Sequence, residues 1–271
     1  MSPTETQSNY IKIVLPEGDN PNIIEAARRA KQDKLCEPML LRGDNTLQKA
    51  AEMLSAGKVD GMVAGIDHTT RDVILTTRDC VGLLDGNKTF GSLFVFEFPD
   101  GRSLIMADGG VTKNPSSEQL ADIVIFTHDA ARPILDDTPR VAMLSFSTLG
   151  SGGRDDSITK IQETISIVKE RRPDIIIDGE MQLDAAVNAL IGQKKAPDSP
   201  VAGRANILIT PDLNSGNILY KSIEQFGGAH AYGPVLLGFK KPVSDLSRGS
   251  TTDDVYGCLK IIAAQVKEAK K

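Results

Sequence analysis

The chain has 271 residues, of which 40% are hydrophobic and 25% charged, and its formal net charge is -5. These values are ordinary for a globular protein, and no apolar run approaches the ~20 residues that a membrane-spanning helix needs. The acidic balance argues against a nucleic-acid partner and favours a small molecule, although local arginines could hold a small anion.

The cysteines and the amino terminus indicate the expected cellular location of the protein. Cys36, Cys80 and Cys258 are too few and too scattered for a disulfide framework or a metal cluster, so we expect reduced thiols and no metal site. The first residues, MSPTETQSNY, lack a basic region followed by an apolar stretch. We therefore expect no secretory signal, a frayed tail and a cytoplasmic location.

Short β-branched runs alternate with longer helical periods along the chain. The expected strands are residues 11–15, 38–41, 61–65, 102–107, 140–146, 174–178, 205–210 and 234–239. The expected helices are residues 22–31, 46–54, 69–79, 116–131, 157–171, 180–191, 214–226 and 252–269. The last helix carries apolar Val255, Leu259, Ile262, Ala263 and Val266 at helical spacing. Strands buried on both faces predict an α/β fold with mostly parallel sheets covered by helices.

Two stretches have the composition of crossings between lobes. The segment ARPILDDTPR (131–140) contains two prolines and an acidic pair, and KKPVSDLSRG (240–249) breaks the pattern again. We therefore expect a discontinuous first lobe, residues 1–138 plus 243–271, and a second lobe, residues 139–242. Both crossings would lie beside one cleft, and open α/β sheets bind ligands outside the carboxyl ends of their strands.

Polar loops after strands are the remaining candidates for a site. The common nucleotide, hydrolase and zinc signatures GxGxxG, GxxxxGK[ST], GxSxG and HExxH are absent. The loop SFSTLGSGGR (145–154) offers hydroxyls and glycines whose backbone N–H groups could cup an anion. The alternative is an ordinary turn.

The stretch PVSDLSRGSTTDD, Pro242 to Asp254, joins a guanidinium, hydroxyls and carboxylates immediately before the last helix. Helix amino termini attract anions, and Arg248 beside Ser247 adds a planar fork that suits phosphate. For Asp254, the spacing from Thr251 favours a capping box over a catalytic role.

Other polar residues are weaker candidates. His128 falls within a helical pattern, where we expect a structural role, whereas His68 follows the strand 61–65 and suits a site better. Arg71 and Arg78 lie seven residues apart, which places them on one helix face two turns apart. The alternative for both arginines is a solvated basic face.

Several long motifs in order resemble the phosphate acetyltransferase and phosphate butyryltransferase family, and are closest to the acetyltransferase branch. They are MADGGVTKNPSSEQLADI, RVAMLSFSTLGSG, DGEMQLDAAV, KAPDSPVAGRANILITPDLNSGNILYK and GPVLLGF followed by PVSDLSRG. The resemblance is strong from about Ile105 to Ala264 and weaker from Lys12 to Cys80.

The resemblance implies two doubly wound α/β lobes around a central cleft, an architecture like that of isocitrate and isopropylmalate dehydrogenases, commonly as a homodimer. It implies acetyl transfer between coenzyme A and inorganic phosphate, giving acetyl phosphate, with coenzyme A as a substrate and no cofactor. The family's serine and arginine fall on Ser247 and Arg248. Its acidic residue falls on Asp254, which the resemblance makes the general base. We expect further substrate contacts from Ser147, Thr148, Gly150, Asn217, Arg71 and Arg78.

The chain also departs from the family pattern. Leu75 stands where the family has an arginine, and Leu149 stands where SFST is usually followed by lysine. Ser244 replaces the usual asparagine before Asp245, and the longer insertion usual after LLRG (40–43) is missing. Arg71 or Arg78 could replace the missing arginine.

Three alternatives to acetyl transfer stay open at this point. One is a phosphate butyryltransferase or another acyl specificity, because a trimmed first lobe could reshape the acyl pocket. Another is a relative that binds a phosphorylated or acyl ligand without turnover, which Leu75 and Leu149 would suit. The last is a decarboxylating dehydrogenase that uses nicotinamide, for which we see no paired aspartates placed to hold a divalent metal.

Overall fold

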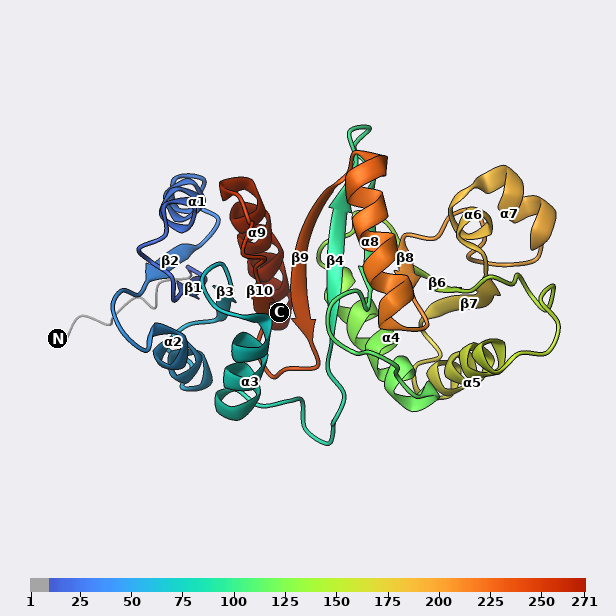
Figure 1. Ribbon diagram of the computed structural model, residues 1–271, viewed down its shortest axis with the longest axis horizontal. Helices are drawn as coiled ribbons and strands as arrows, with labels where there is room; N and C mark the ends of the chain where they lie inside the picture. The colour runs from blue at the N-terminus through green and yellow to red at the C-terminus, as the bar shows by residue number, and fades with distance from the viewer. Residues whose placement is uncertain (1–9) are drawn as a thin grey trace. The chain divides into compact units, whose positions relative to one another are not determined.

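The computed structural model describes residues 10–271, so the tail expected at the amino terminus lies outside the described residues. The chain divides into two compact α/β units, shown as ribbons in Figure 1. Unit 1 contains the chain up to Val81 together with Lys241–Lys271, and unit 2 contains Gly82–Lys240.

Unit 1 is built on a parallel sheet with the strand order β2-β1-β3-β10. Its strands are β1 (Lys12–Leu15), β2 (Glu37–Leu40), β3 (Gly61–Ala64) and β10 (Val243–Asp245). Its helices are α1 (Pro21–Gln32), α2 (Thr46–Ser55), α3 (Thr70–Cys80) and α9 (Thr252–Ala269). The five apolar positions predicted on the last helix are all buried, and α9 packs beside α1.

Unit 2 has the strand order β9-β4-β5-β8-β6-β7. Its strands are β4 (Gly91–Glu97), β5 (Ser103–Ala107), β6 (Arg140–Leu144), β7 (Ile176–Met181), β8 (Ile207–Ile209) and β9 (His230–Leu237). Its helices are α4 (Ser117–Ala131), α5 (Asp156–Arg171), α6 (Leu183–Val187), α7 (Ala189–Lys195) and α8 (Leu213–Gly227). β4 runs antiparallel to both β5 and β9, whereas the pairs among β5, β8, β6 and β7 are parallel.

The α/β fold with mostly parallel pairing is confirmed, with three local differences. β4 and β10 were not predicted, because β4 joins the sheet through antiparallel neighbours and β10 is only a short run within a polar stretch. The single helix expected at 180–191 is two helices, α6 and α7. Asn188 separates them because its side chain accepts hydrogen bonds from the backbone N–H groups of Leu190 and Ile191 and so starts α7 anew.

The boundary between the units also differs from the expected one. The first crossing falls between Val81 and Gly82 rather than near Thr138, while the return crossing falls between Lys240 and Lys241, close to the expected Pro242. The reason is strand pairing, since β4 bonds to β9 and β5 bonds to β8. Segments on both sides of Thr138 therefore share one sheet.

Across residues 10–271, every helix is too short or too polar to traverse a lipid bilayer. Within the same residues, no group of three or more histidine, cysteine and acidic side chains is arranged to hold a metal ion.

Candidate active site

The loops that follow β1, β3 and β10 lie at one edge of the unit 1 sheet, because the carboxyl ends of parallel strands point the same way. These loops carry Glu17 after β1, Gly65 to His68 after β3, and Leu246 to Ser250 after β10. The sheet thus gathers short polar segments that are far apart in the sequence.

Ser247 and Arg248 occupy a tight turn between β10 and α9. The Ser250 N–H donates to the Ser247 carbonyl at 2.9 Å, and the Gly249 N–H donates to the Ser247 hydroxyl at 3.2 Å. Asn22 on α1 donates to the Ser250 carbonyl at 3.1 Å. These bonds fix the backbone of the turn and leave the Ser247 and Arg248 side chains exposed.

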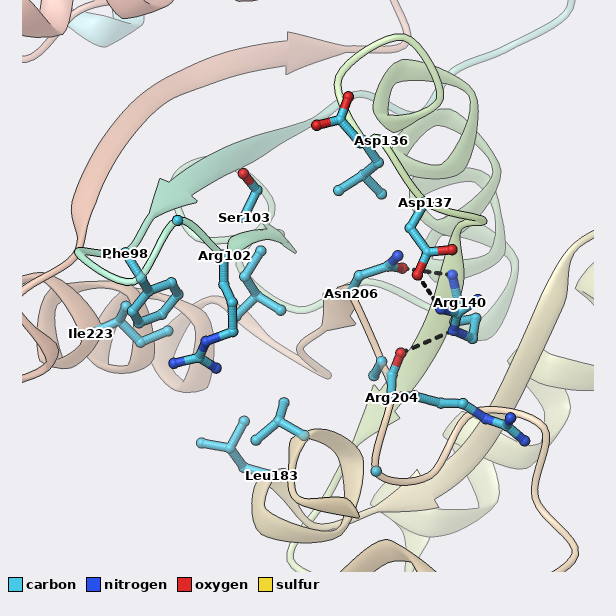
Figure 2. Close-up of a pocket in the computed structure, with 16 residues that line it drawn as sticks. Phe98, Arg102, Ser103, Asp136, Asp137, Arg140, Leu183, Arg204, Asn206 and Ile223 are labelled. Carbon is cyan, nitrogen blue, oxygen red and sulfur yellow. Dashed lines mark hydrogen bonds and ion pairs between the residues drawn. The ribbon is translucent and has the colours of Figure 1, made fainter.

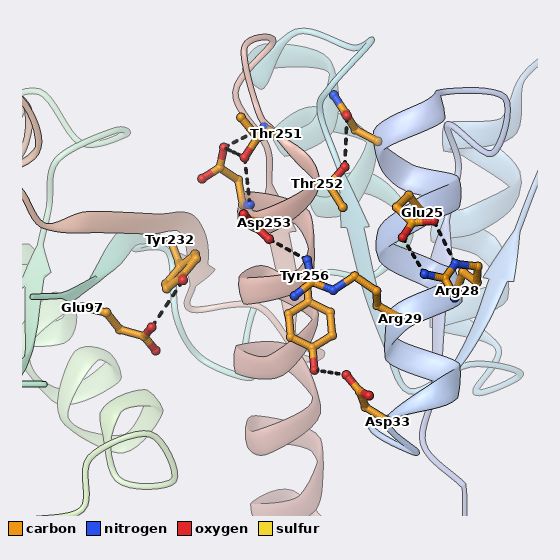
Figure 3. A network of polar contacts seen from close by, with 12 residues as sticks. Glu25, Arg28, Arg29, Asp33, Glu97, Tyr232, Thr251, Thr252, Asp253 and Tyr256 are labelled. Carbon is orange, nitrogen blue, oxygen red and sulfur yellow. Dashed lines mark hydrogen bonds and ion pairs between the residues drawn. The ribbon is translucent and has the colours of Figure 1, made fainter. Parts of the chain in front are cut away.

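Asp254 forms the capping box that its spacing predicts. The Thr251 hydroxyl accepts a hydrogen bond from the Asp254 N–H, and Asp254 Oδ2 accepts from the Thr251 N–H at 2.7 Å and from the Thr251 hydroxyl at 2.8 Å. Beside it, Arg29 on α1 bonds Asp253 at 2.5 Å (Figure 3). The first turn of α9 therefore holds the Asp254 carboxylate firmly, which suits a catalytic group as well as a cap.

Arg29 and Tyr256 extend this anchoring along α9. The Arg29 guanidinium lies 4.3 Å from the centre of the Tyr256 ring, and the Tyr256 hydroxyl donates to Asp33 at 2.7 Å (Figure 3). Helix α9 is thereby fastened to α1 by an ion pair, a cation–π contact and a hydrogen bond.

Two buried carboxylates lie beneath this edge. Glu17 Oε1 accepts hydrogen bonds from the Gly65 N–H at 2.8 Å and the Asp67 N–H at 3.2 Å, and it lies 2.7 Å from His68 Nδ1. Asp245 is buried beside Gly65, where a Cβ atom on the glycine would lie 2.5 Å from Asp245 Oδ1. Burial raises the pKa of Asp245 to about 6. A side-chain hydrogen bond with Thr70 partly offsets the effect of burial, and the nearby charge of Glu17 adds to it.

The two candidate arginines lie at opposite ends of α3. Arg71 is exposed in the first turn, near the carboxyl end of β3, and Leu75 is half-buried in the middle of the helix. Arg78 is exposed in the last turn and pairs with Asp79 at 2.8 Å. Arg71 is therefore the better placed of the two to meet an anion at this edge.

In unit 2, the backbone N–H groups of residues 147–153, in the loop that follows β6, are engaged within the unit. Every backbone N–H from Ser147 to Gly153 already donates within the unit, to Ser145, Ser151, Glu180, Thr148, Ser147 or Gly150. These hydrogen bonds favour the ordinary turn over a cup for an anion. The reason is Glu180, a buried acid in β7 that the sequence pattern did not single out.

Glu180 organises this loop. Its Oε1 accepts from the Ser147 hydroxyl at 2.8 Å and from the Gly150 N–H at 2.7 Å. Burial opposes its ionisation, but the hydrogen bonds from Gly150, Ser147 and Gln162 outweigh burial and lower the pKa of Glu180. An ionised carboxylate therefore holds the loop in place and leaves Phe146 and Leu149 exposed.

Most of the residues expected to contact substrate in unit 2 are buried or hydrogen-bonded within the unit. Ser147 and Thr148 are buried, and the Thr148 hydroxyl accepts from the Gln182 N–H at 3.0 Å. Asn217 on α8 is half-buried, and its side-chain amide donates to the Gly109 carbonyl at 3.3 Å. Ser147, Thr148, Gly150 and Asn217 thus lie in unit 2, whereas Ser247, Arg248, Asp254, Arg71 and Arg78 lie in unit 1.

Asp108, which follows β5, also accepts several hydrogen bonds from the loop around it, as Glu180 does. Its carboxylate accepts from the Ser92 hydroxyl at 2.5 Å and from the N–H groups of Gly110, Val111 and Thr112 at 2.8 to 3.1 Å. Glu17, Asp108, Glu180 and Asp245 were all missed in the sequence. For Glu17, Asp108 and Glu180 the available signal was an acidic residue just after a predicted strand, whereas Asp245 lies in β10, which was not predicted. Only the structure shows that these side chains are buried.

A pocket of about 600 Å³ opens elsewhere in unit 2 (Figure 2). Ser103, Arg140 and Asn206, which line it, stand at the amino ends of β5, β6 and β8. Arg140 there pairs with Asp137 and donates to the Arg204 carbonyl at 3.1 Å. The pocket therefore lies at the edge of the sheet opposite the loops that follow the strands.

Comparison with known proteins identifies the family. Residues 42–264 match the family model of phosphate acetyl/butaryl transferases. A phosphate acetyltransferase from Clostridium acetobutylicum is 43% identical over 223 residues, which is 80% of this chain and 67% of that protein. The structure of a phosphotransacetylase from Streptococcus pyogenes, 31% identical, matches with a TM-score of 0.89 over 96% of this chain and 95% of that one.

A more distant likeness concerns the fold alone. The structure of a putative 4-hydroxythreonine-4-phosphate dehydrogenase from Salmonella typhimurium matches 94% of this chain and 99% of that one, with a TM-score of 0.57 at 11% identity. The expected two-lobe α/β architecture is thereby confirmed. Since the family model covers most of the residues and carries the ordered motifs, the chain belongs to the phosphate acetyl/butaryl transferase family and is an enzyme of that type.

Proposed function

We propose that this chain transfers an acetyl group between coenzyme A and inorganic phosphate, converting acetyl-CoA and phosphate into acetyl phosphate and coenzyme A. The observation that carries the proposal is the turn before α9. It exposes Ser247 and Arg248 at the strand edge of unit 1, and the first turn of α9 holds Asp254 by its capping box. The relatives named as phosphate acetyltransferases support acetyl as the transferred group.

Asp254 is the proposed general base. A thiol is a weak nucleophile until it loses its proton, so a carboxylate within reach of the sulfur can take that proton as the sulfur attacks the acyl carbon. Asp254 accepts its capping bonds through Oδ2. This arrangement fixes the orientation of the carboxylate while the side chain stays partly accessible.

Ser247 and Arg248 are the proposed groups that stabilise developing charge. Negative charge gathers on the carbonyl oxygen and on the departing phosphate, and each positioned donor typically contributes ~2.7 to 4 kcal/mol to such stabilisation. The fixed backbone of the turn supports this role because it limits where the two exposed side chains can reach. Arg71 at the start of α3 is the proposed second contact to phosphate, ahead of Arg78.

In unit 2, Asn217 remains a proposed substrate contact. Ser147, Thr148 and Gly150 have their hydrogen-bonding groups engaged within the loop, so we assign them the shaping of that loop rather than direct donation. The reaction involves no change of oxidation state. Coenzyme A is therefore proposed as a substrate, without a resident cofactor.

The location and assembly of the chain are also proposals. We propose a cytoplasmic protein, which the free thiols of Cys36, Cys80 and Cys258 support. We propose a homodimer, which exposed apolar side chains on α8 support, since Ile218 is 67% and Phe226 is 90% exposed.

The test is release of free thiol from acetyl-, propionyl- and butyryl-CoA with and without phosphate. Release that requires phosphate and is fastest with acetyl-CoA supports the proposal. Faster release from butyryl-CoA would move the assignment to the butyryl branch of the family, and binding without release in every case would contradict an acyltransferase.

A further inference from the structure

His68 and Glu17 form a hydrogen-bonded pair at the strand edge of unit 1. Glu17 is buried, with a side chain 2% exposed, whereas the His68 side chain is 29% exposed. Glu17 lies in the loop after β1, and His68 lies just before the amino terminus of α3. The pair therefore links the interior of the unit to its surface.

The hydrogen bonds of Glu17 determine which nitrogen of His68 carries hydrogen. Backbone N–H groups can only donate, so Glu17 Oε1 acts as an acceptor toward Gly65 and Asp67. The same oxygen lies 2.7 Å from His68 Nδ1, which must therefore also donate. The other ring nitrogen, Nε2, is then the one available to a substrate.

A second buried carboxylate, that of Asp245, lies at the same edge of the sheet as Glu17. Glu17 Oε2 is buried without a hydrogen-bond partner among the described residues. Glu17 Oε1 faces three donors, the N–H groups of Gly65 and Asp67 and the Nδ1 atom of His68, and these contacts fix the orientation of the pair.

We propose that His68 is a second proton-transfer residue of the acetyl transfer, exchanging a proton between Nε2 and the phosphate group, and that Glu17 is its positioning residue. The inference rests on the proposed function. Ser247 and Arg248 belong to the same unit and the same sheet edge as His68, and Arg71 lies in the first turn of α3, the helix that follows His68. No role for His68 follows from the motif that contains Ser247 and Arg248.

The proton balance of the step is closed. When the thiol of coenzyme A attacks acetyl phosphate, the thiol proton passes to Asp254 and a carbon–sulfur bond forms. The bond between the acyl carbon and the phosphate oxygen breaks, and its electron pair stays on that oxygen. In this direction His68 enters the step with hydrogen on Nε2 as well as on Nδ1. Nε2 gives its hydrogen to the departing phosphate oxygen while Nδ1 stays bonded to Glu17. Before the next turnover Nε2 regains a proton from solvent and Asp254 releases the thiol proton to solvent. In the reverse direction, Nε2 takes a proton from the attacking phosphate.

The test compares His68→Gln, Glu17→Gln and the double variant. We expect His68→Gln to lower kcat about 100-fold with little change in the KM for coenzyme A, because general acid–base groups typically contribute that much. Glu17→Gln retains an acceptor oxygen without the charge, and we expect it to lower kcat about 10-fold. If Glu17 acts through His68, the double variant falls no further than His68→Gln, because the two effects are not additive.

A spectroscopic measurement tests the positioning separately. Nitrogen-15 shifts of the His68 ring in the wild type should show hydrogen on Nδ1 and proton exchange at Nε2. We expect Glu17→Gln to mix the two tautomers, and a wild-type ring with hydrogen fixed on Nε2 alone would overturn the inference. If Glu17→Gln does not fold, His68→Gln decides the matter, because an unchanged kcat in that variant also overturns it.

The matched control is His128→Gln. His128 is also paired with a carboxylate, Asp129 at 3.1 Å, but it lies on α4 in unit 2. We expect kcat within about twofold of wild type for this control, and an equal loss in both histidine variants would contradict a specific role for His68. A wild type without phosphate-dependent thiol release contradicts the proposed function, whereas an active wild type with an unaffected His68→Gln contradicts only this inference.

Discussion

At the scale of single residues, Asp254 caps α9 and is also the proposed general base. A substitution can separate these two roles. In Asp254→Asn the amide oxygen can still accept from the Thr251 N–H, but the amide cannot take a thiol proton. We expect kcat to fall by about 100-fold or more, with the melting temperature nearly unchanged. Steady-state kinetics and thermal unfolding of the same sample measure both.

Thr251→Ala is the control for the cap, since it removes the hydroxyl that accepts from the Asp254 N–H. We expect a loss of ~1 kcal/mol in the free energy of unfolding and a smaller effect on kcat. If Asp254→Asn instead lost stability as Thr251→Ala does and kept its rate, capping would be the whole role of Asp254.

Arg248 tests whether a planar fork is needed for phosphate. The side chain is exposed on a turn whose backbone is fixed, so Arg248→Lys should leave the fold intact. We expect the KM for phosphate to rise about tenfold, because an ammonium group cannot make the paired contact of a guanidinium. Arg78→Lys is the matched control, and equal phosphate dependence in the two variants would contradict the prediction.

Asp245 predicts a specific dependence of stability on pH. Its pKa in the folded protein is about 6, above the ordinary 3.8, so the folded state holds this proton more tightly than the unfolded state. The contribution of protonated Asp245 to the stability of the folded state is complete below pH 3.8 and is lost as the pH rises through about 6. Asp245→Asn cannot ionise, and at pH 8 we expect it to raise the free energy of unfolding by roughly 1 to 3 kcal/mol.

Chemical denaturation of wild type and Asp245→Asn between pH 4 and pH 8 measures this difference. Asp108→Asn is the contrasting variant, because Asp108 is also buried but accepts hydrogen bonds from Ser92, Gly110, Val111 and Thr112. We expect that variant to be less stable than wild type by about 2 kcal/mol. A destabilised Asp245→Asn at pH 8 would show that the hydrogen bond with Thr70 outweighs the burial of the Asp245 carboxylate.

At the scale of elements, α3 decides which arginine replaces the one lost at Leu75. Arg71 stands at the amino terminus of the helix, where the dipole favours anions, whereas Arg78 stands at the other end and is paired with Asp79. We expect Arg71→Ala to raise the phosphate concentration needed for half-maximal rate by about tenfold, equivalent to ~1.4 kcal/mol, and Arg78→Ala to do less. Near-wild-type phosphate dependence in both variants would leave Arg248 as the main contact.

At the scale of the whole molecule, the proposed homodimer predicts a role for α8. The double variant Ile218→Asp with Phe226→Asp places charges where a self-association would bury apolar side chains, so we expect it to sediment as a monomer. Ile24→Asp on α1, where the side chain is 39% exposed, is the control and should leave the sedimentation unchanged. A wild-type protein that sediments as a monomer would contradict the proposed homodimer.

The sequence by itself determined the succession of helices and parallel strands and the family. Alternation of β-branched runs with helical periods is a local property, and so are the caps at Thr251 and the ordered motifs from Ile105 onward. The apolar face of α9 was also readable, because helical spacing puts its buried residues in one stripe.

Only the tertiary structure decided the strand partners and the charge environment. β4 pairs with β5 and also with β9, which lies more than 100 residues further along the chain, and this pairing moves the boundary to Val81 and Gly82. Glu17 and Asp245 are likewise 228 positions apart, yet both are buried at one sheet edge, where burial raises the pKa of Asp245 and Glu17 contacts His68. Burial and charge are sums over neighbours in space, and a linear sequence does not specify those neighbours.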